Sequence, residues 1–288
     1  MSQVKFRQHL EEYIFRLLRL SIISACKEQQ LTDLREHISA LVPDVSETYT
    51  SFTLNSYWEH IVRSRHSFQV SLIETVLQFL NTKETTTVVD IGDSSGTHLR
   101  YMIAGNRDGH FNTLSINLDP AAIKKIRSYG LNAIQSRIED MYEHPSFIRD
   151  PNIYLCFETL EHLRDPVTFL HDLASNTTCD YLILSVPYLR KSRVGLHQLR
   201  PQPGHIMTGA DRPFNAEMTH IFELCPADWD LLFRFSGWKI VRSVRFTAYP
   251  KKNILTLTRF LWRRLNFDGH YGIILQPDNS IASQYLDW

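Results

Sequence analysis

From residue 87 onward, short β-rich runs alternate with helical segments along the chain. The runs include "TVVDIG", "TLSINLD", "LNAIQS", "NIYLCFE" and "YLILSVP", and between them apolar residues recur every three or four positions. Strands that alternate with helices form a mostly parallel sheet with helices on both of its faces. The near-continuous apolar runs "NIYLCF" and "YLILSV" suit the buried centre of such a sheet. The sequence therefore predicts an α/β fold.

The first part of the chain has a different pattern. Residues 1–84 carry helical periodicity and few strand signals, and "NTKETTT" separates them from the alternating region. We therefore expect a helical N-terminal cap over residues 1–84 and an α/β domain over residues 85–288. The domain is expected to carry inserts at about residues 189–220 and 251–268.

Composition limits the cellular setting and the partners. Lys+Arg and Asp+Glu both number 31, so the chain as a whole has no bulk attraction for nucleic acid. The four cysteines lie far apart and form no CxxC pair, which favours a reducing compartment. Arg16 and Arg19 interrupt the apolar N-terminal segment, which is typical of an amphipathic helix and not of a signal peptide or membrane span. We expect a cytoplasmic protein.

The stretch "VVDIGDSSGTH" marks the expected ligand pocket. A strand that ends in a small-residue turn before a helix exposes backbone N–H groups at the positive end of the helix dipole. In open parallel sheets, ligands bind at the carboxyl ends of the strands. The glycines follow G-x-x-x-G and not the G-x-G-x-x-G of dinucleotide sites, which favours a nucleoside without phosphates over NAD.

Asp119 ends the second strand and has two interpretations. Its carboxylate can accept hydrogen bonds from a ribose diol, as acidic residues do in dinucleotide sites. Alternatively it caps the helix that "DPAAIKKI" begins, with proline at the first helical position. We favour ribose binding because the acid and the small-residue turn occur together.

The stretch "IYLCFETLEHLRDPVTFL" resembles the post-strand motif of class I S-adenosylmethionine-dependent methyltransferases, in which a buried strand runs into "LEH" and then "DP". "VVDIGDSSG" and "INLDP" are similar to the first motif and to the acidic ribose motif of that family. "FSGWKIVRSVRF" and "GIILQP" resemble its sixth strand and its antiparallel seventh. The likeness extends over about residues 87–277. It implies a Rossmann-like, seven-stranded, mostly parallel sheet and S-adenosylmethionine as cofactor.

The resemblance also implies a set of cofactor-binding residues. The methionine part of the cofactor would be lined by Asp90, Gly92, Asp93, Ser94 and Gly96. Asp119 would hold the ribose, and Ile138 would lie against the adenine with Glu139 nearby. Phe157 and Glu158 would border the methionine side. Ser94 stands where the family has its middle glycine.

The acceptor side is expected within the insert at residues 189–220. His220 is our candidate general base, because "EMTHIFELCPADW" resembles the family's His-containing run; a structural role at the helix start is the alternative. His162 is expected mainly to fix a helix start. The same region contains His197, His205, His220 and Asp211, but their spacing matches no standard metal-ligand motif, so no metal is expected. The arginines of this insert indicate an anionic acceptor or, alternatively, a solvated basic loop.

We therefore expect methyl transfer to a small-molecule, glycan or lipid-precursor acceptor at oxygen or nitrogen, in a protein that is either a monomer or a homodimer. A nucleic-acid acceptor is not favoured. The rival hypotheses are a catalytically silent binding or scaffold protein with this fold, and an NAD-dependent oxidoreductase.

Two further segments have open interpretations. Residues 251–265 predict an amphipathic helix with one apolar stripe among basic residues, formed by Ile254, Leu257, Leu261 and Leu265. This pattern suits either peripheral contact with an anionic membrane or packing onto the rest of the protein. In the predicted cap, a set of aromatic and basic residues is expected either to close over the cleft or only to cover the sheet: Tyr57, Trp58, Arg63 and Arg65.

Overall fold

The computed structural model describes residues 3–50, 52–80, 84–106, 110–195, 219–264 and 267–285. Its main sheet has seven strands in the order β3-β2-β1-β4-β5-β9-β8. The strands are β1 (Thr86–Ile91), β2 (Phe111–Asn117), β3 (Ala133–Gln135), β4 (Ile153–Phe157), β5 (Tyr181–Tyr188), β8 (Trp238–Thr247) and β9 (Gly269–Pro277). The first five pair in parallel, and β9 is antiparallel to both of its neighbours. The predicted Rossmann-like, seven-stranded sheet is confirmed, as is its antiparallel last strand.

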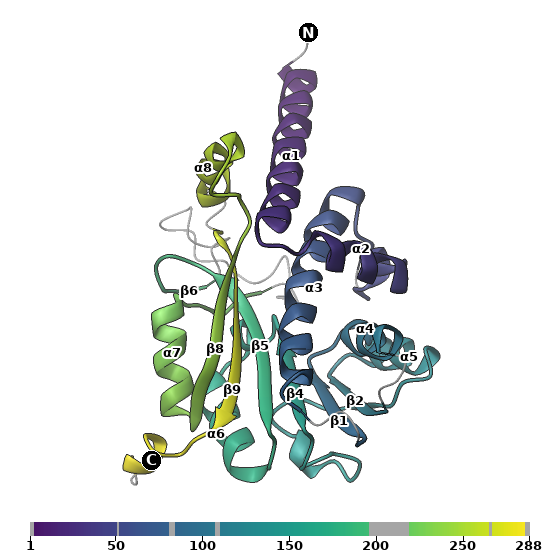
Figure 1. Cartoon of the computed structure of the whole chain (residues 1–288), viewed down its shortest axis with the longest axis vertical. Helices are drawn as coiled ribbons and strands as arrows, with labels where there is room; N and C mark the ends of the chain where they lie inside the picture. Colours follow the sequence, from purple (N-terminus) through teal and green to yellow (C-terminus); the bar gives the residue numbers. More distant parts are fainter. Residues whose placement is uncertain are drawn as a thin grey trace, which may run out of the picture.

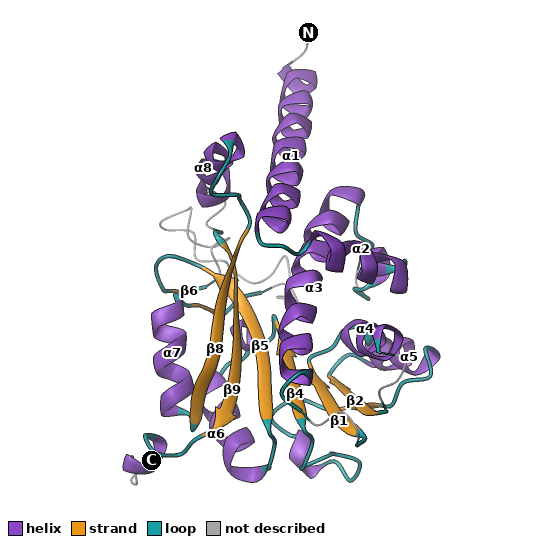
Figure 2. Cartoon of the chain, viewed as in Figure 1, coloured by secondary structure: helices purple, strands orange, loops and turns teal. Residues whose placement is uncertain are grey.

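Helices cover both faces of the sheet (Figure 2). Along β4, Tyr154 and Cys156 belong to a core with the helices α6 (Pro166–Asn176) and α7 (Pro226–Phe235), whereas Ile153 and Leu155 belong to the opposite core. This alternation follows from the two-residue period of a strand whose two faces are both buried. The helices that follow the first two strands are α4 (Thr97–Gly105) and α5 (Pro120–Ser128).

The N-terminal helices are α1 (Gln3–Glu28), α2 (Thr32–Leu41) and α3 (Ser56–Leu77). Helix α3 runs along the sheet, whereas α1 projects away from it (Figure 1). Phe68 and Leu72 of α3 lie against Gly272 of β9 so closely that a Cβ there would come within 2.5 Å of Phe68 Cζ. The N-terminal helices and the sheet therefore share one hydrophobic core.

The described parts of the two inserts are short elements. Strands β6 (Arg193–Val194) and β7 (Phe222–Glu223) pair with each other, and residues 196–218 lie outside the described residues. The 3₁₀ helix η6 (Ile254–Thr258) leads into α8 (Arg259–Arg264) and packs on α1, where Trp262 Nε1 donates to Ser21 Oγ at 3.1 Å. The other 3₁₀ helices are η1 (Val45–Glu47), η2 (Met141–Glu143), η3 (Leu160–His162) and η7 (Ala282–Gln284). Among the described helices, none has the length and apolar character needed to cross a bilayer.

Candidate active site

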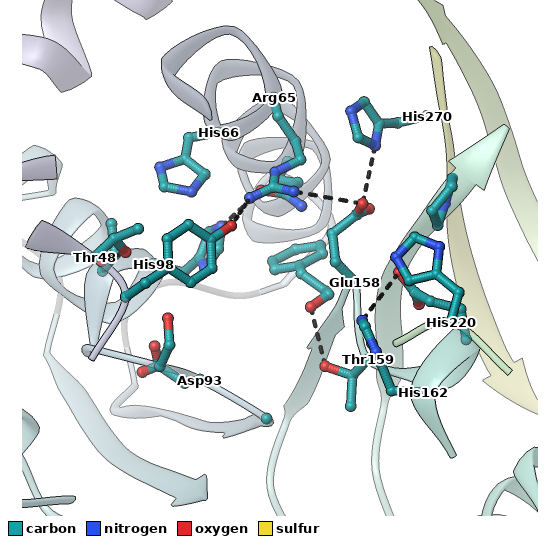
Figure 3. Close-up of a pocket in the computed structure, with 18 of the residues that line it drawn as sticks. Thr48, Arg65, His66, Asp93, His98, Glu158, Thr159, His162, His220 and His270 are labelled. Carbon is teal, nitrogen blue, oxygen red and sulfur yellow. Dashed lines mark hydrogen bonds and ion pairs between the residues drawn. The ribbon is translucent and has the colours of Figure 1, made fainter. Parts of the chain in front are cut away.

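A cavity of about 830 Å³ lies where the parallel strands end. Its walls come from the loops after β1, β2, β4 and β5, from helix α3, and from the loop that contains Thr48 and Thr50. Figure 3 shows this cavity from inside: Asp93 lies on one side, and His162 and His220 lie on the other. Its position and volume are those of a ligand site in an open α/β sheet.

The turn after β1 is built on two glycines and one aspartate. Gly92 and Gly96 have φ of 85° and 70°, a left-handed region that glycine enters without penalty. Asp93 Oδ1 accepts from the backbone N–H groups of Ser95 and Gly96 at 3.1 and 2.8 Å. Ser94 is not among the residues with positive φ, so serine in place of the family's middle glycine fits this turn without strain.

Gly92 is also required for space. A Cβ at this position would come within 2.4 Å of Thr159 Oγ1. The turns after β1 and β4 therefore meet in direct contact at the floor of the cavity. This close approach puts the ends of both strands beside the same ligand.

Asp90 supplies a buried oxygen that has no protein partner. Its side chain is 2% exposed, and Oδ2 receives no hydrogen bond from any described residue. His98 Nδ1 is 3.8 Å from this oxygen. Burial, together with nearby Asp93, raises the pKa of Asp90 well above its ordinary value. Because a buried polar atom without a partner is costly, this oxygen fits a donor from a ligand.

Asp119 caps α5, which is one of its two predicted roles, and its side chain also lines the cavity. Its Oδ1 accepts from Ala121 N at 2.9 Å and so caps α5, while its Oδ2 accepts from Thr50 Oγ1 at 2.6 Å. The hydrogen bond from Thr50 lowers the pKa of Asp119, which keeps the carboxylate ionised. Each oxygen still has a lone pair for a ligand hydroxyl.

Glu158 is held at the centre of the cavity by groups from three elements. Ser185 Oγ donates to Oε1 at 2.8 Å, and His270 Nδ1 and Arg65 Nη1 lie 3.1 and 3.6 Å from Oε2 (Figure 3). Burial tends to raise the pKa of Glu158, but His270, Arg65 and Ser185 outweigh it and hold that pKa well below its usual range. With φ of 50°, Glu158 has the strained backbone that often occurs at functional sites.

A chain of hydrogen bonds links α4, the helix that follows the β1 turn, to Glu158. His98 Nε2–H donates to Gln69 Oε1 at 2.9 Å, and Gln69 Nε2 donates to Ser185 Oγ at 2.8 Å, which in turn donates to Glu158. Burial, and then the charge of Arg65, lower the pKa of His98 to about 3. His98 is therefore neutral, and it couples α4, α3 and β5.

The other side of the cavity holds a histidine pair. His220 Nδ1 lies 3.3 Å from Glu223 Oε1, and Glu223 also pairs with Arg193. His162 Nδ1 donates to the carbonyl oxygen of Thr219 at 3.0 Å, and the two imidazole rings meet edge to face with centroids 4.8 Å apart. Both rings thus have a fixed orientation toward the cavity.

Most of the predicted site residues line this one cavity. They are Asp90, Gly92, Asp93, Ser94, Asp119, Phe157, Glu158 and His220, together with the predicted cap residues Tyr57, Trp58 and Arg65.

The remaining predicted residues lie elsewhere. Gly96 closes the turn from behind, where a Cβ would come within 2.6 Å of Leu131. Ile138 packs against the hydrophobic core, and Glu139 is exposed and pairs with Arg137 at 3.4 Å; neither lines the cavity. Arg63 donates to the carbonyl oxygens of Val42 and Pro43. His197, His205 and Asp211 lie outside the described residues.

The sequence analysis did not predict that the polar face of α3, or His98 after the β1 turn, lines the cavity. Gln69 and His66 are buried and line the cavity together with His98, and Thr50 reaches Asp119 from the loop before α3. The available signal was the polar run "RSRHSFQ" inside an otherwise apolar helix. A buried helix carries such residues only where they have polar partners.

No protein-family model matches the chain, and no curated protein matches it in sequence. Among solved structures, a proposed sarcosine dimethylglycine methyltransferase from Galdieria sulphuraria matches with a TM-score of 0.54 at 10% identity, over 88% of this chain and 99% of that one. The O-methyltransferase of a trans-AT PKS multienzyme of Brevibacillus brevis, in complex with S-adenosyl-L-homocysteine, matches at 0.49 and 11% identity over 75% of each chain. A SAM-dependent methyltransferase from Archaeoglobus fulgidus matches at 0.47 and 16% identity over 77% of this chain and 100% of that one.

The Galdieria match and the strand order together show that this chain has the class I S-adenosylmethionine-dependent methyltransferase fold. At such identities the likeness concerns the fold alone.

Proposed function

We propose that this chain binds S-adenosylmethionine in the cavity and transfers its methyl group to a small-molecule acceptor at oxygen or nitrogen. One observation carries the proposal: a single cavity joins the Gly92–Gly96 turn and Asp119 to a pair of oriented histidines. The first part suits a nucleoside ligand, and the second suits proton transfer on an acceptor.

Three groups would hold the cofactor. Asp119 would accept hydrogen bonds from the ribose hydroxyls, and the exposed side chain of Leu118 offers apolar surface beside it. The unpartnered Asp90 oxygen would accept from the amino group of the methionine part. When bound, the cofactor supplies a methyl group on a positively charged sulfur. Ile138 and Glu139 would contact the adenine only if the base extends beyond the described cavity.

His220 is placed to accept a proton. Burial tends to raise the pKa of Glu223, but hydrogen bonds from His220 and Arg193 lower it to about 2, so Glu223 is ionised. An ionised carboxylate orients the ring with its proton on Nδ1 and leaves Nε2 as the proton acceptor. An acceptor hydroxyl benefits from such a base, whereas a free amine needs less help.

The surface at α8 supports an acceptor associated with lipid. Ile254, Leu257 and Phe260 are 79%, 72% and 69% exposed, and five basic residues flank them: Lys251, Lys252, Arg259, Arg263 and Arg264. Exposed apolar side chains within a basic set suit the surface of an anionic membrane. We propose peripheral membrane contact there, with a glycan- or lipid-precursor acceptor.

Calorimetric titration with S-adenosylmethionine, S-adenosylhomocysteine and NAD tests the cofactor. We expect the first two to bind and NAD not to bind. Asp119→Ala should weaken this binding by at least about 10-fold, the loss of roughly 1.4 kcal/mol or more of charge-assisted hydrogen bonding.

Asp165→Ala is the matched control. Asp165 also precedes a proline, and its Oδ1 caps α6 by accepting from Thr168 N at 2.9 Å, but it does not line the cavity. Both variants lose a helix cap worth about 1 kcal/mol, and only Asp119→Ala should lose affinity. NAD binding alone would contradict the proposal. Cofactor binding without methyl transfer to any acceptor would indicate a silent binding protein.

A further inference from the structure

Glu161 is a buried carboxylate without a hydrogen-bond partner. It is 1% exposed, and neither Oε1 nor Oε2 receives a hydrogen bond from any residue that the structure describes. Two other acids of the cavity have partners. Glu158 accepts a hydrogen bond from Ser185 and pairs with His270, and Glu223 pairs with Arg193. Because a buried carboxylate without hydrogen bonds is costly, a cationic ligand in the adjoining cavity would stabilise it.

Two imidazoles face this carboxylate. Ligand atoms of Glu161, His162 and His220 all lie within 4.8 Å of one another, and His162 Nε2 is 3.9 Å from Glu161 Oε1. Two ligands of one zinc ion, each at about 2.1 Å, are at most about 4.2 Å apart. Small side-chain rotations would therefore bring all three onto one ion.

Both histidines already have the outer contacts of metal ligands. His162 Nδ1 donates to the Thr219 carbonyl oxygen, and His220 Nδ1 faces the Glu223 carboxylate. Such contacts to a carbonyl or carboxylate fix the ring so that Nε2 faces the ion. Figure 3 shows the two rings together on the side of the cavity away from Asp93.

We propose that Glu161, His162 and His220 bind one divalent first-row transition-metal ion at the acceptor end of the cavity. Two imidazoles and one carboxylate suit Zn²⁺ or Mn²⁺, with open positions toward the cavity. An ion there would lower the pKa of a bound acceptor hydroxyl, whose proton would leave to solvent water. This role rests on the proposed function and favours an oxygen acceptor, but metal binding itself does not depend on it.

The metal site and the base role of His220 exclude each other, because both use the same Nε2 lone pair. With the ion bound, the metal replaces His220 as the group that makes the hydroxyl acidic. Sequence spacing does not indicate this site, because His220 is far along the chain from the adjacent Glu161 and His162.

Calorimetric titration of chelator-stripped, full-length protein with Zn²⁺, Mn²⁺ and Mg²⁺, without S-adenosylmethionine, tests the site. We expect one equivalent of Zn²⁺ or Mn²⁺ to bind and to raise the Tm. Glu161→Gln and His220→Asn should weaken binding by more than about 100-fold, and Glu223→Gln by about 10- to 100-fold. Glu161→Gln should keep the metal-free Tm, because the substitution removes no hydrogen bond to a described residue.

His171→Asn is the control, since His171 is exposed on α6 and does not line the cavity. It should bind metal like the parent chain. Absence of binding to the parent, a preference for Mg²⁺, or undiminished binding in Glu161→Gln and His220→Asn would overturn the site. So would a loss of binding confined to His197→Ala or His205→Ala. Metal binding and S-adenosylmethionine binding are measured in separate titrations. The metal site and the proposed cofactor site can therefore be contradicted independently.

Discussion

At the scale of single residues, Gly92 decides whether the turns after β1 and β4 can meet. Gly92→Ala should lower the free energy of unfolding by more than the roughly 1–2 kcal/mol that a left-handed conformation costs, because the new Cβ would meet Thr159 Oγ1 at 2.4 Å. Urea unfolding measures the loss. Thr159→Ala in the same chain should recover part of it.

Gly130→Ala provides the comparison for this variant. Gly130 has φ of 78°, and an added Cβ there would find no atom within 4 Å. The free energy of unfolding of Gly130→Ala should therefore fall only by the cost of the left-handed backbone conformation. Equal losses for the two alanine variants would contradict the close contact at Gly92.

His98 gives stability a pH dependence. Its pKa is about 3 in the folded chain and about 6.5 when unfolded, so the unfolded state binds more protons between these values. Stability should therefore fall as pH drops from about 6.5, by up to about 1.4 kcal/mol per pH unit for this group. The charged or titratable groups around it are Arg65 and His66 of α3, Asp90 of β1 and Glu158 after β4.

The measurement compares the pH dependence of urea unfolding in the parent chain and in His98→Asn, so that the contributions of the neighbouring acids cancel to first order. The variant should have a shallower decline between pH 6.5 and pH 4. Parallel curves would show that His98 is not held neutral.

Only some of the residues that line the cavity could be located from the sequence. Asp90, Gly92, Asp93 and Asp119 could be placed because strand, turn and helix start are local patterns whose geometry follows from the sequence. Gln69, by contrast, enters the site from a helix far away in the chain, and its place depends on how α3 packs. No local pattern encodes that packing.

At the scale of elements, η6 and α8 differ from the predicted helical stripe. The pattern suggested that Leu257 and Leu261 share one face of an α-helix. Instead, Asn253 Oδ1 accepts from Leu255 N at 2.9 Å and begins a 3₁₀ helix. Its period of three residues places Ile254 and Leu257 together in solvent, and Phe260 of α8 is exposed beside them. Trp262, by contrast, points toward α1 and packs there. One part of this segment therefore packs on the protein, and another part is exposed to solvent.

Membrane contact can be tested on this exposed row. Leu257→Glu with Phe260→Glu should weaken cosedimentation with phosphatidylserine-containing vesicles by at least about 10-fold, because it removes buried apolar area and adds repulsion. Leu231→Glu, on the exposed face of α7, should bind like the parent. No vesicle binding by the parent, or equal losses in both variants, would contradict the contact.

At the scale of the whole molecule, the N-terminal helices complete the core. The strand and helix pattern predicted the sheet and its faces correctly, but periodicity alone could not show that α3 is part of the central packing. Four of its apolar side chains pack on the sheet: Phe68, Leu72, Ile73 and Val76. Each contributes about 1.5–3 kcal/mol by burial, which together is comparable to the whole stability of a typical domain.

A chain reduced to residues 85–288 should therefore fail to fold. We expect the full chain to unfold in one cooperative transition of circular dichroism and tryptophan fluorescence. The shortened chain should lack near-ultraviolet signal and a sharp transition. A cooperative transition of the shortened chain would show that residues 1–84 form a separable cap.

A crystal structure of the complex with S-adenosylhomocysteine would show whether the cavity is the cofactor site. We expect the ribose hydroxyls to lie within hydrogen-bond distance of Asp119 and the amino group to lie near Asp90 Oδ2. Its sulfur should then lie closer to His162 and His220 than its ribose does. A ligand bound elsewhere, or a cavity that stays empty at saturating concentration, would contradict the account.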